Sequence, residues 1–153
     1  MKKLHPLLPI LLLIVSCSKP INDESLVERN GIYYQVNSET PYSGKSFTLH
    51  DNGQKKGEGN YKDGILNGDF IEWFSNGQKM GEGSYKDGKF DGLITEWYKN
   101  GQKKIDVILT QGVLNGSVTQ WYENGQKKSE VTFKDGKEVG SEKKWNEDGS
   151  VKK

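Results

Sequence analysis

The sequence predicts an all-β protein, a single elongated antiparallel sheet of stacked β-hairpin repeats. Three observations lead to this prediction. The chain repeats itself every 24 residues, each repeat carries two turn signals, and the segments between the turns are too short for helices. A fixed period of this length is typical of architectures in which each unit contacts only its neighbours.

The tetrapeptide Asn-Gly-Gln-Lys marks the repeat most clearly, because four identical copies follow one another at a spacing of 24 residues. A Trp and a Tyr-Lys-Asp-Gly motif, degraded in the third copy to Leu109-Thr110-Gln111-Gly112, keep the same step. Since each unit adds two strands, we expect a sheet of about 9 to 10 strands. The units are residues 52–75, 76–99, 100–123 and 124–147, with a partial repeat over residues 148–153.

Each unit contains two turns about a dozen residues apart. The Asn-Gly pairs predict tight hairpin turns, because both central residues of such a turn need positive φ. These pairs are Asn52-Gly53, Asn76-Gly77, Asn100-Gly101 and Asn124-Gly125. The Asp-Gly pairs, each followed by a second glycine, predict longer loops. In the first unit we expect strands near 55–61 and 68–74, with Tyr61 opposite Gly68 and Lys56 opposite Trp73.

This register gives the predicted sheet two different faces. One face is expected to be apolar and carries Gly57, Gly59, Tyr61, Phe70 and Phe74 in the first unit. The other is expected to carry a column of tryptophans interleaved with Lys56, Met80, Lys104 and Lys128. Lysine stems over indole rings would add cation–π attraction of roughly 0.5 to 1 kcal/mol at each exposed site.

The tryptophan column is the candidate binding surface, because Trp is the residue most enriched where binding energy concentrates. Its central members are Trp73, Trp97 and Trp121. The alternative is that these rings only hold the sheet together.

These motifs resemble the MORN repeat variant, which occurs in bacterial proteins often labelled as YwqK-type antitoxins of toxin–antitoxin systems. The resemblance covers the chain from about residue 28 to its end. It includes a segment before the first full repeat, residues 28–51, in which Gly44, Phe47 and Leu49 fall at the places of Gly68, Ile71 and Trp73. The resemblance implies an antiparallel sheet of stacked hairpins. The resemblance implies less about activity. The sequence features described next predict that this protein is exported, and an exported protein cannot meet a cytoplasmic toxin.

The first sixteen residues predict a lipoprotein signal peptide. A basic start precedes an apolar stretch from Leu7 to Val15, which is far shorter than the ~20 residues of a spanning helix. Ile14-Val15-Ser16-Cys17 then resembles the lipobox of bacterial lipoproteins, with Cys17, the sole cysteine, as the acylated N-terminus. Residues 17–27 predict this lipidated terminus and a polar tether. The alternative is an ordinary secretory peptide with a stray cysteine.

Lipid anchoring predicts both a location and a first partner, the lipid bilayer. Because each buried CH₂ contributes roughly 0.8 kcal/mol, two or three acyl chains on Cys17 hold a protein on a membrane almost permanently. Ser18 follows Cys17 in place of the aspartate that resembles an inner-membrane retention signal. We therefore expect an exported, membrane-anchored protein, with the outer membrane or the cell surface favoured over the inner membrane.

The composition argues against nucleic-acid binding and against catalysis. Lys2 and Lys3 precede Cys17, which leaves 20 basic residues against 21 acidic ones, without the basic excess that phosphates require. His50 is the sole histidine beyond the signal peptide, which is too few for a catalytic triad or a zinc site of several His or Cys ligands. A glycosidase pair of Glu58 and Glu72 is the remaining enzymatic alternative. We expect no enzyme activity, no metal and no cofactor.

Two functions remain open from the sequence. The first is a non-enzymatic scaffold of the cell envelope that binds another protein or a cell-wall polymer, because repeat sheets present broad surfaces. The second is an antitoxin-like neutraliser of a toxin partner, as the family label suggests. A toxin-like reading frame beside the gene would favour the second.

Overall fold

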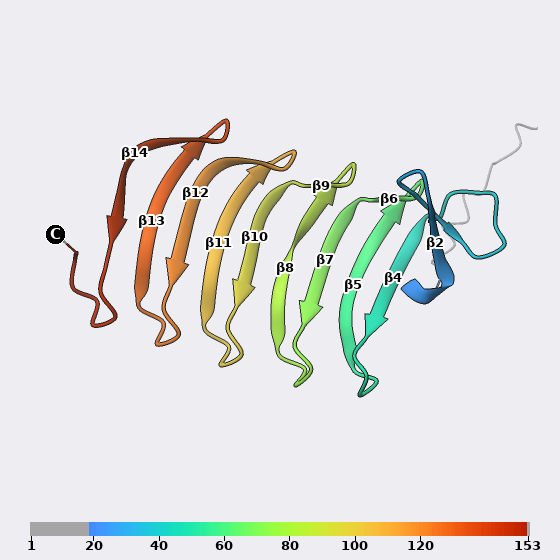
Figure 1. Cartoon of the computed structure of the whole chain (residues 1–153), viewed down its shortest axis with the longest axis horizontal. Helices are drawn as coiled ribbons and strands as arrows, with labels where there is room; N and C mark the ends of the chain where they lie inside the picture. The colour runs from blue at the N-terminus through green and yellow to red at the C-terminus, as the bar shows by residue number, and fades with distance from the viewer. Residues whose placement is uncertain (1–18, 153) are drawn as a thin grey trace, which may run out of the picture.

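The computed structural model describes residues 19–152, and its main element is one long twelve-stranded sheet (Figure 1). Two short strands, β6 (Ile65–Leu66) and β9 (Lys89–Phe90), pair only with β5 and β8. The other strands follow in the order β1 (Ile21–Asn22), β4 (Gly44–Leu49), β5 (Lys55–Lys62), β7 (Gly68–Trp73), β8 (Lys79–Lys86), β10 (Gly92–Trp97), β11 (Lys103–Thr110), β12 (Val113–Trp121), β13 (Lys127–Lys134) and β14 (Lys137–Lys144). The predicted all-β ladder of hairpins is confirmed.

The N-terminal end of the ladder departs from a uniform antiparallel sheet. Strand β1 pairs with β4 in parallel, so that Ile21 lies opposite Ser46. The 3₁₀ helix η1 (Asp23–Ser25) follows, and β2 (Leu26–Arg29) and β3 (Ile32–Gln35) form a second, two-stranded sheet at this end (Figure 1). The tether expected over residues 17–27 is therefore too long, because residues 21–27 lie in ordered elements. The sequence pattern does not reveal these elements, because β1 has only two residues.

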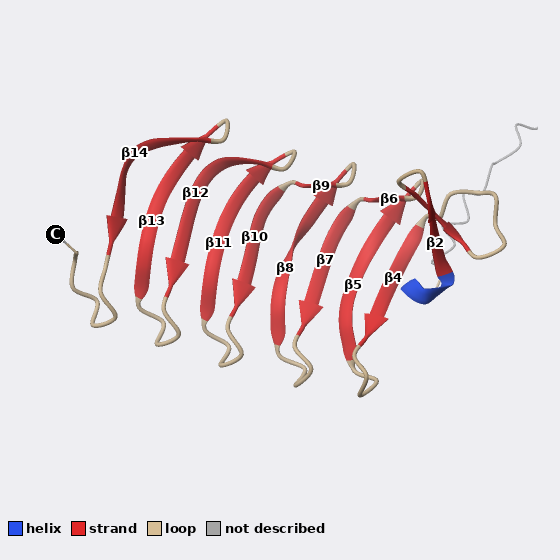
Figure 2. Cartoon of the chain, in the orientation of Figure 1, coloured by secondary structure: helices blue, strands red, loops and turns tan. Residues whose placement is uncertain are grey.

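The two kinds of turn exchange the roles that the sequence predicts for them. Asp63 (φ 50°) and Gly64 (φ 77°) both adopt positive φ, so Asp-Gly forms the tight two-residue turn. At Asn52-Gly53 only Gly53 has positive φ, and a three-residue loop is closed by hydrogen bonds from Gly53 N to His50 O and from His50 N to Gln54 O. The Asn52 side chain instead accepts a hydrogen bond from Gln54 N. These loops lie at the two ends of the strands (Figure 2).

The tighter Asp-Gly turn also changes the register at the tip of each hairpin. Tyr61 lies opposite Leu66, not Gly68, and Gly68 lies opposite Tyr85 of the next hairpin. The strand breaks at Asn67, between β6 and β7, and beyond this break Gly57 lies opposite Glu72. The predicted register is therefore wrong at the tip and correct in the body of the hairpin, so Tyr61 and Phe70 keep their predicted face.

The Asp-Gly tips stack on one another through backbone hydrogen bonds. Gly64 N donates to Tyr42 O at 2.8 Å, and the same bond recurs in each later tip: Gly88 N to Leu66 O, Gly112 N to Phe90 O, and Gly136 N to Leu114 O. The degraded third copy keeps this geometry, because Gln111 adopts the positive φ of the aspartates (51°) and its N–H donates to the Asp91 carboxylate at 2.9 Å. The tips therefore form a continuous ladder.

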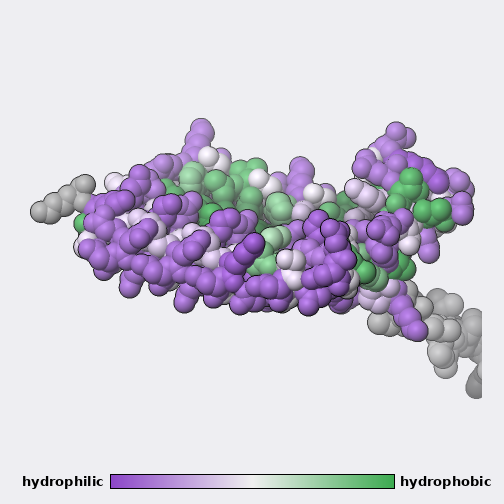
Figure 3. Space-filling view, turned by 60° about the horizontal axis from the view of Figure 1, so that its bottom comes forward, coloured by the Kyte–Doolittle hydropathy of each residue, from purple (hydrophilic) through white to green (hydrophobic). Residues whose placement is uncertain are grey.

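The interior is thin, as expected for one layer of strands. Tyr61 and Ile94 are the buried apolar residues of the described chain, at 9% and 8% exposure. Tyr61 packs against Tyr33 and Tyr42, with ring centroids 5.1 and 6.0 Å apart. Burial raises the pKa of Tyr61, and the Asp23 carboxylate raises it further. Figure 3 shows apolar side chains in a broken green band along the molecule, bordered by hydrophilic residues.

Candidate binding surface

The predicted tryptophan column forms one face of the sheet near the Asn-Gly turns. Each Trp lies opposite a lysine of the next strand: Trp73 opposite Lys79, Trp97 opposite Lys103, and Trp121 opposite Lys127. All four tryptophans are partly buried. Trp73, Trp97 and Trp121 are therefore aligned, but each ring is partly covered.

The lysines that cover these rings are not the ones predicted from the sequence. The ammonium of Lys79 lies 5.2 Å from the Trp97 ring, and the same contact recurs for Lys55 over Trp73, Lys103 over Trp121 and Lys127 over Trp145. The predicted set was Lys56, Met80, Lys104 and Lys128. A β-bulge explains the difference: Trp73 lies opposite Lys79 and Glu72 opposite Gly81, so Met80 is the extra residue and lies on the other face.

Each covering lysine is also paired with an acidic residue three positions later. Lys79 contacts Glu82, and the other pairs are Lys55 with Glu58, Lys103 with Asp106, and Lys127 with Glu130. Exposed ion pairs contribute about 0.2 to 1 kcal/mol each, similar to an exposed cation–π contact. Glu58 is thus bound by a lysine on this face, whereas Glu72 belongs to the opposite face, so they do not form the facing carboxylate pair of a glycosidase.

We expect Trp97→Leu to lower the free energy of unfolding by about 1 kcal/mol, because it removes the ring that Lys79 covers while keeping most of the apolar volume. Urea unfolding followed by circular dichroism measures this loss. The partner variant Lys79→Met keeps the side-chain stem but removes the charge. In the double variant the two losses should overlap, and strictly additive losses would contradict a stabilising Lys79–Trp97 contact.

On the opposite face, hydrogen bonds connect successive Asn-Gly turns. His50 Nε2 lies 2.8 Å from Trp73 O, and the hydroxyls of Tyr98 and Tyr122 donate to Trp121 O and Trp145 O at 2.9 Å. His50 is therefore a structural residue of the turn. Asparagine side chains make a parallel set of bonds, from Asn52 to Ser75 O, Asn100 to Glu123 O and Asn124 to Glu147 O.

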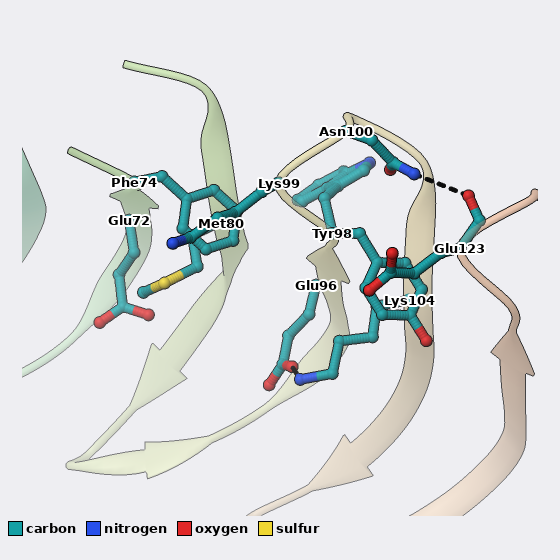
Figure 4. A pocket seen from close by; sticks show the side chains of 10 residues that line it. Glu72, Phe74, Met80, Glu96, Tyr98, Lys99, Asn100, Lys104 and Glu123 are labelled. Carbon is teal, nitrogen blue, oxygen red and sulfur yellow. Dashed lines mark hydrogen bonds and ion pairs between the residues drawn. The ribbon is translucent and has the colours of Figure 1, made fainter. Parts of the chain in front are cut away.

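The turn at Asn76-Gly77 interrupts both sets of bonds. Phe74 occupies the place of His50 and Tyr98 and has no group to bond the next turn, and Asn76 donates to Gln78 instead. An open cavity of about 700 Å³ lies at this interruption, with Phe74, Met80 and Tyr98 among its lining residues (Figure 4). Lys99 lies with its ammonium 5.9 Å from the Phe74 ring.

Beside the same turn, one carboxylate lacks the lysine that its equivalent one unit later has. Glu96 is bound by Lys104 at 2.9 Å across β10 and β11 (Figure 4). The corresponding pair one unit earlier is Glu72 and Met80, so the lysine is missing. Within residues 19–152, Glu72 takes part in no ion pair. Sequence comparison of the units at a 24-residue offset could have found this substitution.

The described residues contain no group of three or more His, Cys, Asp or Glu side chains that could hold a metal ion. Over residues 19–152 no helix has the length and apolar character needed to cross a bilayer. Cys17 and the predicted signal peptide, residues 1–16, lie outside the described residues.

Comparison with known families gives an independent view of the repeat. Residues 42–63, 66–87 and 114–135 match the family described as MORN repeat variant. Three segments of the chain are thus similar to MORN-variant repeats. Each matched segment ends at the Asp of an Asp-Gly turn and has an Asn-Gly turn at its centre. Between the second and third matches lies the copy in which Gln111 replaces this Asp. No curated protein matches the chain.

The matched segments agree with the hydrogen bonds of the tips. A MORN-variant segment begins at the residue whose carbonyl accepts from a turn glycine: Tyr42 for Gly64, Leu66 for Gly88 and Leu114 for Gly136. Each segment therefore corresponds to a hairpin that descends to an Asn-Gly turn and returns to the next tip.

Proposed function

We propose that this protein is a non-enzymatic binding module of the cell envelope, anchored to a membrane through acylated Cys17, whose repeat sheet docks another protein. The MORN-variant repeats carry this proposal, because stacked repeats of this kind present extended surfaces and not an enclosed catalytic cleft. The alternating Lys and Trp side chains of one face are the proposed contact surface, with Trp73, Trp97 and Trp121 at its centre.

The tryptophan face suits a docking role for a chemical reason. Aromatic rings supply much contact area at little cost in side-chain entropy, and lysine–carboxylate pairs around them form a polar rim. The spacing along this face is regular, because every unit places one Trp and one Lys at the same step. A partner with its own repeated acidic and apolar groups would match it.

The membrane anchor is tested by Cys17→Ser. We expect the native protein in the membrane fraction and the variant in the soluble fraction, because the variant lacks the thiol that takes the lipid. Immunoblotting of the two fractions measures the change, and Lys19→Ala, which keeps the whole lipobox, serves as the control. Unaltered membrane association of Cys17→Ser would contradict the anchor.

Docking is tested by cross-linking the anchored protein in its own envelope and recovering the adducts. We expect a defined protein adduct that Trp97→Leu and Trp121→Leu reduce. A toxin whose activity falls on binding would support the neutraliser function instead of the scaffold. Recovery of no adduct, or of adducts that both variants leave unchanged, would overturn docking through this face.

A further inference from the structure

A second, smaller cavity lies on the face opposite the tryptophan column, beside η1. Its volume is about 210 Å³. Most of its lining residues lie on strands β4, β5 and β7, and η1 contributes Asp23. Its lining residues are Asp23, Ser46, Phe47, Thr48, Gly57, Glu58, Gly59, Tyr61, Leu66, Phe70, Glu72 and Tyr85.

Two glycines create the space. Gly57 and Gly59 lie where the third unit has Ile105 and Val107, whose side chains occupy the same face. A Cβ on Gly59 would contact only Leu66 Cδ2, at 3.6 Å. The second unit also has a glycine at this place, Gly83, but there Ile94 and Phe70 already fill the space. The glycines of the first unit therefore leave space on this face where side chains of the second and third units fill it.

The cavity has an excess of negative charge. Asp23 and Glu72 supply the carboxylates on this side of the sheet, and none of the lining residues is Lys, Arg or His. Glu58 is bound by Lys55. Glu72 is the carboxylate whose lysine is replaced by Met80, and Asp23 Oδ1 is a buried oxygen without a hydrogen-bond partner. Within the described residues, neither the Asp23 nor the Glu72 carboxylate takes part in an ion pair, and the two come from separate elements.

Aromatic rings form much of the remaining wall. Phe70 and Tyr85 lie with their centroids 5.1 Å apart, and Tyr61 lies beside Gly59 and Leu66 in the same wall. A cation over the face of an aromatic ring is attracted by about 0.5 to 2 kcal/mol, more as water is removed. Burial raises the pKa of Tyr85, and the Glu72 carboxylate raises it further, so both tyrosines stay neutral at ordinary pH.

We propose that this cavity binds an alkylammonium group, with its nitrogen between Asp23 and Glu72 and its aliphatic stem against Tyr61, Phe70 and Tyr85. The volume suits an ammonium on a short chain, because a water molecule occupies roughly 30 Å³ of liquid. The group belongs either to a free amine or to a lysine side chain of a partner. This site is independent of the tryptophan face and of the membrane anchor.

The direct test is a titration of the full chain, kept in detergent, with n-butylammonium chloride. Chemical shifts of the Gly57 and Gly59 amides report binding. We expect saturable shifts that n-butanol, which has the same stem without the charge, does not produce. A tripeptide with a central lysine and blocked ends forms the second arm. Preference for the peptide assigns the site to a partner's lysine, and preference for the amine assigns it to a free ligand. Saturation by neither overturns the proposal.

Variants then identify the groups that bind. Asp23→Asn should weaken n-butylammonium by about tenfold, because the lost hydrogen bond is charged and partly buried. Glu72→Gln should weaken it by about threefold, because this carboxylate is exposed. The matched control is Glu96→Gln, which changes the equivalent residue one unit later and lies outside the cavity. Equal weakening by Glu72→Gln and Glu96→Gln would overturn the proposed position.

A final variant removes the cavity without removing a charge. Gly59→Val copies the valine that the third and fourth units carry at this place, Val107 and Val131, so the sheet accepts it. We expect an unchanged circular dichroism spectrum and a loss of n-butylammonium binding of at least tenfold. Native binding by a folded Gly59→Val protein would show that the ligand lies elsewhere.

Discussion

Deletion of one complete unit, residues 76–99, should leave a folded and shorter protein. The deletion joins Ser75 to Asn100, which rebuilds an Asn-Gly turn between β7 and β11. Trp73 then lies opposite Lys103 as Trp97 does in the native chain, and Glu72 gains Lys104 as a partner. Because each hairpin contacts only its neighbours, stability is nearly a sum of local terms and falls by about one unit's share. Circular dichroism and urea unfolding measure the outcome.

Deletion of half of the same unit, residues 76–87, is the matched control and should unfold the C-terminal part of the sheet. It removes β8, so β7 is followed by β10, which runs in the same direction and cannot pair with it through a tight turn. Loss of strand signal and a lower unfolding midpoint are expected. If both deletions leave the same stability, the 24-residue unit is not the unit of folding.

The ladder of hairpins was predictable because the repeat determines it. Four copies of Asn-Gly-Gln-Lys at a fixed step leave room for two strands per unit, and alternation along each strand assigns the two faces. Tyr61 and Phe70 lie on one face, and the tryptophans lie on the other, as predicted. A one-residue error at the tips does not alter these faces, because the break at Asn67 restores the register.

The turn types were not predictable from the dipeptides alone. Asn-Gly and Asp-Gly both favour positive φ, so the pair does not reveal which turn has two residues. Each of these loops has three residues, because it includes the residue just before Asn-Gly, such as Asp51. This extra residue allows a turn in which only the glycine has positive φ. The bulge that follows brings Lys79, not Met80, over Trp97. Bulges of one residue leave no distinct signal in the pattern of apolar residues.

The candidate binding sites depend on differences between units, which a repeat pattern averages out. Phe74 and Met80 are apolar at places where other units have His, Tyr or Lys. Gly59 has no side chain at the place where the third unit has Val107. Each substitution is visible in the sequence, but their common location is not, because pairing across strands brings Glu72 and Gly57 together. The contribution of Asp23 was hidden further, since η1 lies in a segment without any periodic pattern.

Gly64→Ala should be among the most destabilising single substitutions in the first hairpin. Gly64 has a φ of 77°, which costs a residue with a side chain about 1 kcal/mol. An added Cβ would also contact Ile32 Cγ2 and lie 2.8 Å from Tyr33 O, so β3 must move. That movement strains the hydrogen bond from Tyr33 N to Gly64 O and costs a further ~2 kcal/mol. Urea unfolding should therefore show a loss of about 3 kcal/mol.

Gly53→Ala is the matched control, because Gly53 has nearly the same φ, 79°, and nothing within 4 Å of an added Cβ. We expect a loss of about 1 kcal/mol from backbone strain alone. The difference between the two variants then measures the packing of β3 on the first Asp-Gly tip. Since Tyr33 also packs on Tyr61, Gly64→Ala should expose the Tyr33–Tyr42–Tyr61 cluster and raise tyrosine quenching by acrylamide. Equal losses of stability for both variants would mean that the N-terminal segment contributes nothing to the ladder.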